Sequence, residues 1–303
     1  MDLMSYSLEV RDVRKSYGKF VAVDGVSLAV PEGSIFGLLG PNGAGKTSTI
    51  RMIMDITAPD AGEILFFGHP RRSEDLRRVG YLPEERGLYR KMGVTEHLLF
   101  LAEIRGLKRR AVLPRIEQWL ERVGLAEWRK AKIEELSKGM QQKVQLIGTI
   151  LHEPDLLLLD EPFSGLDPLN QELFKELLLD YRQRGKSVIL STHGMELAER
   201  MCDHIGLISH GRVVLTGELA AIKRQVGGNS FRLIADGDLD RLHSLPEIEQ
   251  AVAQNGIVKL MLRPEADGPE VLRQLVQFLR VHEFRSEEPA LEQIFLKAVR
   301  DAA

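Results

Sequence analysis

The sequence has a single cysteine, Cys202, and no long apolar run. One cysteine excludes a framework of internal disulfides and fits a reducing compartment. A membrane-spanning helix needs about 20 consecutive apolar residues, whereas the longest apolar stretches here, such as Leu156–Leu159, have the length of a buried strand. The first residues, MDLMSYSLEV, lack a basic segment followed by an apolar core, so we expect no secretory signal. We therefore expect a chain that is soluble by itself and reaches a membrane only through a partner.

The sequence also lacks an excess of charge of either sign. Lys and Arg together number 41 and Asp and Glu 44, which gives a formal net charge of −3. This balance gives no reason to expect a nucleic-acid partner, because binding to phosphates favours a basic surface. Long heptad arrays, low-complexity tracts and internal repeats are absent as well. The 303-residue chain, with 44% hydrophobic and 28% charged residues, is long enough for one large core and a smaller one.

What the sequence does contain is a glycine-rich loop. It follows a short apolar strand, Ser34–Leu39, and leads into helical spacing over Lys46–Ile56, which is the context that a phosphate-binding loop requires. Backbone N–H groups at a helix N-terminus favour an anion, Lys46 can reach the β- and γ-phosphates, and Thr47 offers a hydroxyl to Mg²⁺. The candidate phosphate-binding residues are Gly40, Pro41, Asn42, Gly43, Ala44, Gly45, Lys46, Thr47 and Ser48.

Two neighbouring carboxylates follow the apolar run of DLLLLDEP at 155–162. Asp160 comes at the end of a buried strand, where a carboxylate can hold Mg²⁺ directly or through water. Glu161 comes next and can orient the attacking water as a general base. Because side chains alternate along a strand, the two carboxylates can serve separate roles. The loop and the acidic pair together predict a site that binds and hydrolyses a nucleoside triphosphate.

The rest of the first 220 residues predicts an α/β fold. Residues 6–30 alternate apolar and polar and are broken by glycine, for example at Gly25, which predicts short antiparallel strands. Residues 92–134 have helical spacing, with Pro114 in the first turn of a second helix. A β–α–β order predicts a parallel sheet. Its expected elements are strands at Leu156–Leu159 and Ser187–Leu190, a helix at Leu169–Gln183, and further strands at Asp203–Leu207 and Arg212–Leu215.

A composition change at QVGGNS, near residues 224–230, marks a boundary before a second unit. The order strand, helix, strand, strand, helix, strand and closing helix predicts a small α+β unit of ferredoxin-like type. We expect an apolar stripe on the last helix, Leu291, Ile294, Phe295 and Ala298, to pack on the unit's own sheet. The expected elements are strands 230–235, 247–253, 257–263 and 281–286 and helices 238–244, 269–280 and 290–300.

In this order, the motifs resemble the nucleotide-binding subunit of ABC (ATP-binding cassette) transporters over about residues 6–220. Leu136–Met140, LSKGM, resembles the family's signature sequence, and Ser164–Asp167, SGLD, matches its D-loop. The resemblance implies that Ser137 and Gly139 contact the γ-phosphate bound by a second copy and that Asp167 lies between the two ATP sites. By the same resemblance, His193 contacts the γ-phosphate and helps place the water, and Tyr17 stacks on adenine. Taken alone, Tyr17 could equally be a strand-edge core aromatic.

Two departures from the common pattern resemble the branch of ABC ATPases that serves drug-resistance and sodium-efflux export. Many relatives have a glutamine where this chain has Glu84, so Glu84 is a candidate metal ligand or a contact to the membrane partner, and both readings stay open. The signature reads LSKGM instead of LSGGQ, yet Ser137 and Gly139 remain. In that branch the membrane subunit is a separate chain. The C-terminal unit, which ends in ALEQIFLKAVR, also resembles the accessory domain of the branch.

The resemblance implies a P-loop NTPase of ABC type at 1–224, with an antiparallel β subdomain and an inserted helical subdomain at about 84–150, followed by an accessory domain at 225–303. It implies the substrate ATP, the cofactor Mg²⁺, a second copy, a transmembrane permease and a place at the cytoplasmic face of the membrane. One alternative is a soluble ATP-driven clamp without a transport role, which usually has coiled coils or two cassettes in one chain. Another is a non-hydrolysing ATP sensor, for which Glu161 and His193 would not be needed.

Overall fold

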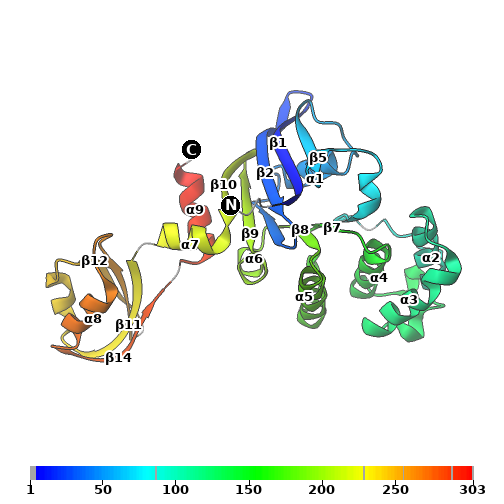
Figure 1. Ribbon diagram of the computed structural model, residues 1–303. Coiled ribbons are helices and arrows are strands. Elements are labelled where there is room, and N and C mark those ends of the chain that lie inside the picture. Colours follow the sequence, from blue (N-terminus) through cyan, green and yellow to red (C-terminus); the bar gives the residue numbers. More distant parts are fainter. Residues whose placement is uncertain (1–4, 86, 228, 255, 288, 302–303) are drawn as a thin grey trace. The chain divides into compact units, whose positions relative to one another are not determined.

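The computed structural model describes residues 5–85, 87–227, 229–254, 256–287 and 289–301 (Figure 1). The chain divides into two units, residues 1–217 and 218–303. Arg86, which lies near Glu84 in sequence, and Gly228, in the segment 224–230, are outside the described residues. No helix of the described ranges is both long enough and apolar enough to cross a bilayer.

A six-stranded sheet forms the centre of the first unit, and its strands from β9 to β6 run parallel. A two-residue connection joins β9 to β10, which makes that edge pair antiparallel. Strands β3 and β7 are buried at every residue, as expected for a sheet covered on both faces. The mixed sheet confirms the predicted α/β fold. The strands in spatial order are β10 (Arg212–Glu218), β9 (His204–Ser209), β3 (Ile35–Leu39), β8 (Ser187–Thr192), β7 (Leu156–Asp160) and β6 (Val79–Leu82).

A second sheet, four-stranded and antiparallel, covers helix α1 (Lys46–Ile53) on one side of the central sheet (Figure 1). One hydrophobic core joins this sheet, α1 and the central sheet, and its largest buried side chains include Phe36 and Phe66. Helix α1 therefore has sheet on both sides, which fixes where its N-terminus points. The strands in spatial order are β2 (Phe20–Pro31), β1 (Tyr6–Tyr17), β4 (Ala61–Phe66) and β5 (His69–Pro70).

The structure has two long strands, β1 and β2, where the glycines predict several short ones. The prediction of a strand break at Gly25 is therefore wrong. Val13 pairs with Val26 and Arg14 pairs with Asp24, which makes Gly25 the extra residue of a bulge. Gly25 has φ +73°, in the left-handed region that glycine adopts without a steric penalty. The glycine bends the strand without ending it.

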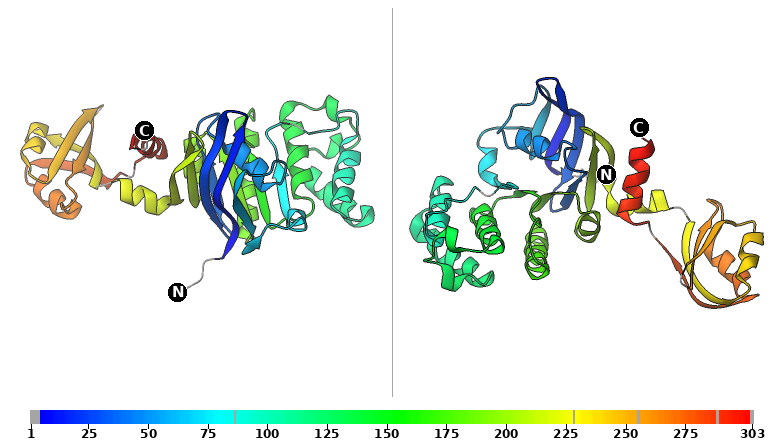
Figure 2. Two further views of the ribbon diagram at one scale, coloured as in Figure 1. Left: turned by 90° about the horizontal axis from the view of Figure 1, so that it is seen from above. Right: turned by 180° about the vertical axis from the view of Figure 1, so that it is seen from behind.

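Helices fill the connections of the central sheet. Figure 2 shows α2 and α3 beside α4 at one end of the first unit, and α5 and α6 follow β7 and β8. Helix α3 begins at Arg109, so Pro114 lies inside it and the predicted first-turn position is wrong. Helix α1 ends at Ile53 instead of Ile56, because Asp55 adopts φ +58° and cannot continue it. The bounds are α2 (Val94–Ile104), α3 (Arg109–Arg122), α4 (Lys138–Ile150), α5 (Pro168–Gln183) and α6 (Met195–Met201), with 3-10 turns at Asp75–Arg78, Ala126–Trp128 and Ile133–Glu135.

The second unit is an antiparallel sheet of order β12-β13-β11-β14, and its β-α-β-β-α-β sequence of elements agrees with the ferredoxin-like expectation. The helix between β11 and β12 is a 3-10 helix, and α8 ends at Leu275, five residues before the predicted end. The sheet core draws on β11 to β14 and α8, whereas α9 lies against α7. The apolar stripe of α9 therefore packs mainly on α7, which corrects the expected contact with the sheet. The bounds are α7 (Leu219–Gly227), β11 (Asn229–Gly237), η4 (Leu239–Ser244), β12 (Ile248–Gln254), β13 (Ile257–Leu262), α8 (Gly268–Leu275), β14 (Leu279–Ser286) and α9 (Leu291–Asp301).

Candidate functional site

Strand register brings the predicted site residues to one edge of the central sheet. Leu39 at the end of β3 pairs with Thr192 at the end of β8. Asp160 at the end of β7 pairs with Ser191, again on β8. The residues that follow these strands, Gly40, Glu161 and His193, therefore emerge side by side. Ligands of open α/β sheets bind outside the carboxyl ends of the strands, which is where these residues lie.

The glycine loop wraps the N-terminus of α1. Gly40 has φ +152° and Gly45 has φ +109°, and a Cβ at either position would collide with backbone, that of Gly45 lying 2.5 Å from Ala22 O. Lys46 is the first residue of the helix, and its Nζ donates to Gly40 O at 2.7 Å and Pro41 O at 3.1 Å. The side chain thus folds back over the loop whose first helical N–H groups have no partner within the helix. Loop amides and an ammonium group together form an anion site.

Burial lowers the pKa of Lys46, and the neighbouring carboxylates of Glu161, Asp160 and Glu84 oppose that shift. Only 6% of the Lys46 side chain is exposed, and its Nζ lies 3.8 Å from Glu161 Oε1. Lys46 thus places its amine beside Glu161 at the mouth of the glycine loop.

Glu161 and His193 contact each other directly. His193 Nδ1 lies 2.9 Å from the same Glu161 Oε1 that faces Lys46, and because a carboxylate only accepts, the imidazole donates. The Glu161 side chain is 10% exposed and that of His193 is 59% exposed. Glu161 has φ +47°, which is uncommon for a residue with a side chain and more so before a proline. Such local strain is typical of functional sites.

Asp160 is buried to 1% exposure, and among the described residues neither of its carboxylate oxygens has a hydrogen-bond partner. Ser191 Oγ, opposite it in the sheet, is buried without a partner as well. A buried carboxylate with two unpaired oxygens is costly unless a cation compensates it. The donor set therefore fits Mg²⁺, which prefers a few carboxylate or hydroxyl oxygens, waters and substrate phosphates. Within the described ranges, no group of three or more His, Cys, Asp or Glu side chains could hold a metal alone.

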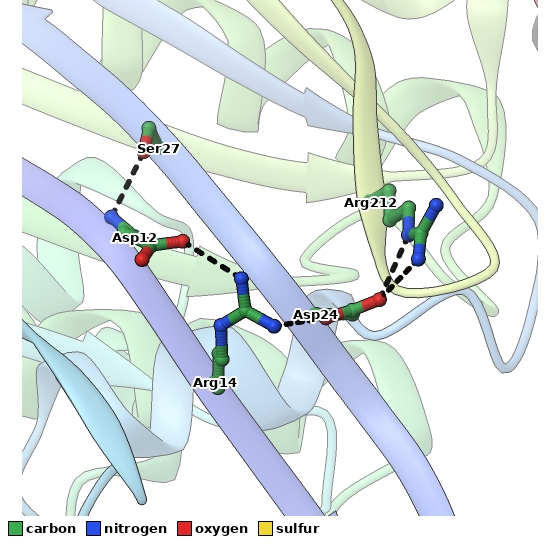
Figure 3. Close-up of polar contacts among 5 residues, drawn as sticks. All are labelled: Asp12, Arg14, Asp24, Ser27 and Arg212. Atoms are coloured by element: carbon green, nitrogen blue, oxygen red, sulfur yellow. Dashed lines mark hydrogen bonds and ion pairs between the residues drawn. The ribbon is translucent and has the colours of Figure 1, made fainter.

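Tyr17 ends β1 with 45% of its surface exposed, and Lys15 Nζ lies 5.9 Å from the centre of its ring. The exposure disfavours the reading as a core aromatic. Ion pairs connect the hairpin of β1 and β2 to β10. Figure 3 shows Arg14 between Asp12 and Asp24, and Asp24 accepts from Arg212 at 2.6 and 2.8 Å. The hydrogen bond from Arg212 holds the pKa of Asp24 below its usual value.

Backbone hydrogen bonds beside this ion pair connect the hairpin to the glycine loop. Asp24 N donates to Gly211 O at 2.8 Å, and Gly211 N donates to Ala44 O at 2.9 Å. The turn between β9 and β10 thus lies between the antiparallel sheet and the loop. Through it the hairpin and the glycine loop form one rigid assembly.

Ser137, Gly139 and Asp167 form a second group. Ser137 is the N-cap of α4 and accepts from Met140 N, and Asp167 is the N-cap of α5 and accepts from Asn170 N at 2.9 Å. Asn170 links the two helix starts, because a Cβ on Gly139 would lie 3.2 Å from Asn170 Nδ2. That backbone hydrogen bond from Asn170 lowers the pKa of Asp167. Contacts within the described residues join these three to one another, while Lys46, Glu161 and His193 form a separate cluster.

Comparison with known proteins identifies the family. Residues 23–164 match the family model for ABC transporters, and residues 217–299 match the C-terminal domain of ATP-binding proteins like DrrA1-3. The chain is 41% identical over 292 residues to the uncharacterized ABC transporter ATP-binding protein YhaQ of Bacillus subtilis, covering 96% of this chain and 98% of that protein. The chain belongs to the ATP-binding proteins of ABC transporters.

Two further comparisons cover the first unit. The Nod factor export ATP-binding protein I of Cupriavidus metallidurans is 38% identical over 218 residues, 71% of this chain and 72% of that protein. The solved structure of an ATP-binding subunit of an ABC transporter superposes with a TM-score of 0.68 at 34% identity, covering 73% of this chain and 93% of that one. The match to the DrrA1-3-like domain confirms the predicted accessory domain. As an ABC ATP-binding protein, the chain binds ATP and has ATPase activity by family.

This ABC protein has Glu84 where many relatives have a glutamine, and the effect of that difference can be tested. Glu84 is exposed and follows β6. Its negative charge is one of those that raise the pKa of the Lys46 amine. Replacing Glu84 with glutamine removes one negative charge beside Lys46 and Glu161 but leaves the glycine loop intact. We expect ATP affinity to stay within a few-fold while turnover or its pH dependence changes.

The measurement for Glu84→Gln is ATPase rate against ATP concentration between pH 6 and 9, a range of about three units around the usual working pH. Glu85→Gln serves as the matched control, because Glu85 is the adjacent exposed acid. A complete loss of ATP binding in Glu84→Gln would show that the carboxylate is needed for binding itself.

Sequence reasoning missed Gln142, Gln145 and Ser191, all buried near the site. Gln142 and Gln145 are polar residues at helical spacing within the apolar stretch of α4, and that pattern could have indicated buried amides with specific partners. Ser191 precedes Thr192 and His193, and only its register with Asp160 shows its place.

Proposed function

We propose that this chain is the ATP-hydrolysing subunit of an ABC export system, in which two copies bind two ATP and two Mg²⁺ face to face and drive a separate transmembrane permease from the cytoplasmic side. The observation that supports it best is the cluster at the sheet edge, where Lys46, Asp160 and the Glu161–His193 pair meet beside the glycine loop. The export direction rests on similarity to a relative whose name states export and on the DrrA1-3-like domain.

In the proposed cycle, the residues of this cluster exchange partners. Glu161 Oε1 faces both Lys46 and His193. The phosphates of ATP take up the Lys46 ammonium and the His193 imidazole, and Glu161 is then free to accept the proton of an attacking water. Thr47 and Asp160 would hold Mg²⁺, which when bound neutralises charge on the phosphates.

Exposure at the second group supports pairing of two copies. Ser137 and Asp167 are exposed, and beside Asp167 the side chain of Leu169 is 81% exposed. In a face-to-face pair of copies, Leu169 would be covered by the second chain. In the dimer, Ser137 and Gly139 of one copy would complete the phosphate site at Lys46 of the other.

A second exposed surface supports docking of a permease. Tyr89 is 54% exposed and packs edge-on against Phe100, with ring centres 5.2 Å apart, and Ile104 on the same helix as Phe100 is 64% exposed. Tyr89 also lies 5.8 Å from the ring of the buried His97, whose pKa burial lowers to about 4. This surface begins a few residues after Glu84 in the chain. A partner bound there would therefore affect the position of Glu84 at the nucleotide site.

The docking proposal predicts where crosslinks form. A cysteine in place of Tyr89 or Lys91 should crosslink, in native membranes, to a cytoplasmic helix of one polytopic membrane protein. The natural Cys202 can remain, because it is buried and its pKa is raised to about 12. Arg200→Cys, on α6, is the matched control, since the Arg200 side chain is 66% exposed. Crosslinks that form only at Arg200, or to ribosomal or nucleic-acid partners, would contradict the transporter assignment and favour a soluble ATP-driven switch.

A further inference from the structure

Helix α4 has three buried polar side chains along one face. Gln142, Gln145 and Thr149 are 3%, 7% and 7% exposed, and their spacing of three and four residues places them on the same side of the helix. The two glutamines donate to backbone carbonyls at the carboxyl edge of the central sheet, Gln142 Nε2 to Pro162 O at 3.3 Å and Gln145 Nε2 to Pro83 O at 3.1 Å. Thr149 Oγ1 lies 2.9 Å from Gln145 O in its own helix and 3.4 Å from Tyr81 O, and its single proton serves mainly the closer carbonyl.

Gln145 holds the backbone on both sides of Glu84. Its Nε2 also donates to Glu85 O at 3.5 Å, so the two carbonyls that it binds flank Glu84. The amide orientation is fixed by these contacts, because a flipped amide would set its oxygen against two carbonyl oxygens. Glu84 itself is exposed. Gln145 therefore holds the backbone from which the Glu84 side chain extends.

The same helix connects this segment to the rest of the site. Helix α4 begins at its N-cap Ser137, and Gln142 binds the carbonyl of Pro162, the residue after Glu161. If α4 rotates as one body, the backbone beside Glu84 and the backbone beside Glu161 would move together. A change at Ser137 would in this way reach both segments.

We propose that Gln145 is a positioning residue that places Glu84 at the nucleotide site and couples that placement to the orientation of α4. The proposal rests on the proposed ATPase function. Gln145 is not a catalytic residue, because it acts through Glu84 and the backbone around it.

The carbonyl oxygen of the Gln145 amide supports a role for this residue in two orientations of α4. Among the described residues, Gln145 Oε1 has no hydrogen-bond partner although the side chain is 7% exposed. A buried acceptor without a donor is unfavourable, so an arrangement that brings an N–H to it is stabilised relative to this one. Gln145 can thus hold the Glu84 segment by its donor in one state and by its acceptor in another. Methionine at this position could do neither, and glutamate could only accept.

The test is the ATPase kinetics of the full-length Gln145→Met chain. Methionine keeps the length and volume of the side chain and removes both hydrogen-bonding groups. We expect kcat to fall about tenfold, the scale of a small misplacement at a reacting site, with KM for ATP changed less than about twofold. Thr149→Val is the matched control, because it removes a buried hydrogen bond from the same helix face without touching the carbonyls beside Glu84. It should lower the melting temperature to a similar degree and leave kcat unchanged.

A double-mutant cycle distinguishes positioning from a general structural role. In a Glu84→Ala background, the further change Gln145→Met should reduce kcat less than about twofold, because the residue that Gln145 positions is gone. Gln145→Glu, which keeps the size and the acceptor but loses the donor, should be impaired like Gln145→Met. This second variant also keeps the test open if Gln145→Met fails to fold.

The positioning role of Gln145 and the proposed ATPase function are overturned by different results. An equal loss of kcat from Gln145→Met in both backgrounds, or a loss matched by Thr149→Val, would overturn the positioning role. A wild-type chain that binds no ATP and shows no ATPase activity would instead overturn the proposed function, whatever the variants do.

Discussion

A Glu161→Gln chain should bind ATP with Mg²⁺, hydrolyse it about 100-fold or more slowly than the wild type, and accumulate as a dimer. The rate loss follows because a positioned general base contributes about 10²- to 10⁴-fold. Binding should persist, because the glutamine keeps an oxygen where Glu161 Oε1 faces Lys46 and His193. The amide also removes a negative charge beside the expected γ-phosphate position, which favours the bound state.

The accumulation of a dimer tests the pairing of two copies. If closure depends on γ-phosphate contacts from Ser137 and Gly139 of the second copy, then a chain that cannot cleave the γ-phosphate should stay closed. Size-exclusion chromatography with light scattering should show a dimer with ATP and Mg²⁺ and a smaller species with ADP. Glu63→Gln, which changes an acid with a 54% exposed side chain on β4, should behave like the wild type. A Glu161→Gln chain that stays monomeric with ATP and Mg²⁺ would refute the face-to-face arrangement.

Replacing Lys46 with alanine should abolish detectable ATP binding. A hydrogen bond to a charged group contributes about 1.5–3 kcal/mol, so the loss of the expected contacts from Lys46 to two phosphates corresponds to about a 100-fold weaker Kd or more. Deleting the ammonium also leaves Gly40 O and Pro41 O without their donor. The measurement is titration of a fluorescent ATP analogue, with ATPase rate as the second readout.

The controls for Lys46→Ala separate charge from packing. Lys46→Met keeps the apolar stem of this buried side chain and should lose binding as Lys46→Ala does. Lys175→Ala removes a lysine that pairs with Glu172 on α5 and should leave binding unchanged. Normal ATPase activity in Lys46→Ala would show that the nucleotide site is elsewhere.

The sequence predicts most of what lies within one motif and less of what depends on contacts between segments. The loop at Gly40–Ser48 and the run that ends at Asp160 could be read because each motif has a local pattern tied to a strand or helix. The pairing of Glu161 with His193 could be expected only from the family resemblance, since the two are brought together by the register of β7 and β8. The position of Gln145 in the apolar stretch of α4 can indicate a buried amide but not its partners, because these lie about 60 residues earlier in the chain.

The errors in the fold predictions have a similar origin. A glycine such as Gly25 can end a strand or bulge it, and the choice depends on whether a neighbouring strand continues the pairing. Leu291 and Ile294 of the α9 stripe are buried, and Phe295 and Ala298 are partly buried. The hydrophobic pattern cannot tell which element covers them. Here that element is α7, which precedes the sheet in the chain.

The close approach of the glycine loop to the antiparallel sheet has a consequence for which nucleotides the protein accepts. Ala22 O lies where a Cβ on either Gly45 or Gly211 would contact it, at 2.5 and 2.9 Å, so the backbone of β2 touches the loop without intervening side chains. Tyr17 lies in the same hairpin as Ala22, and Lys46 follows Gly45. The spacing between the exposed aromatic and the ammonium group is thus set by backbone contacts. If Tyr17 stacks on the base and Lys46 contacts the β- and γ-phosphates, as the family resemblance implies, a nucleotide must match that spacing. Nucleotides with one, two and three phosphates would then be distinguished by their length.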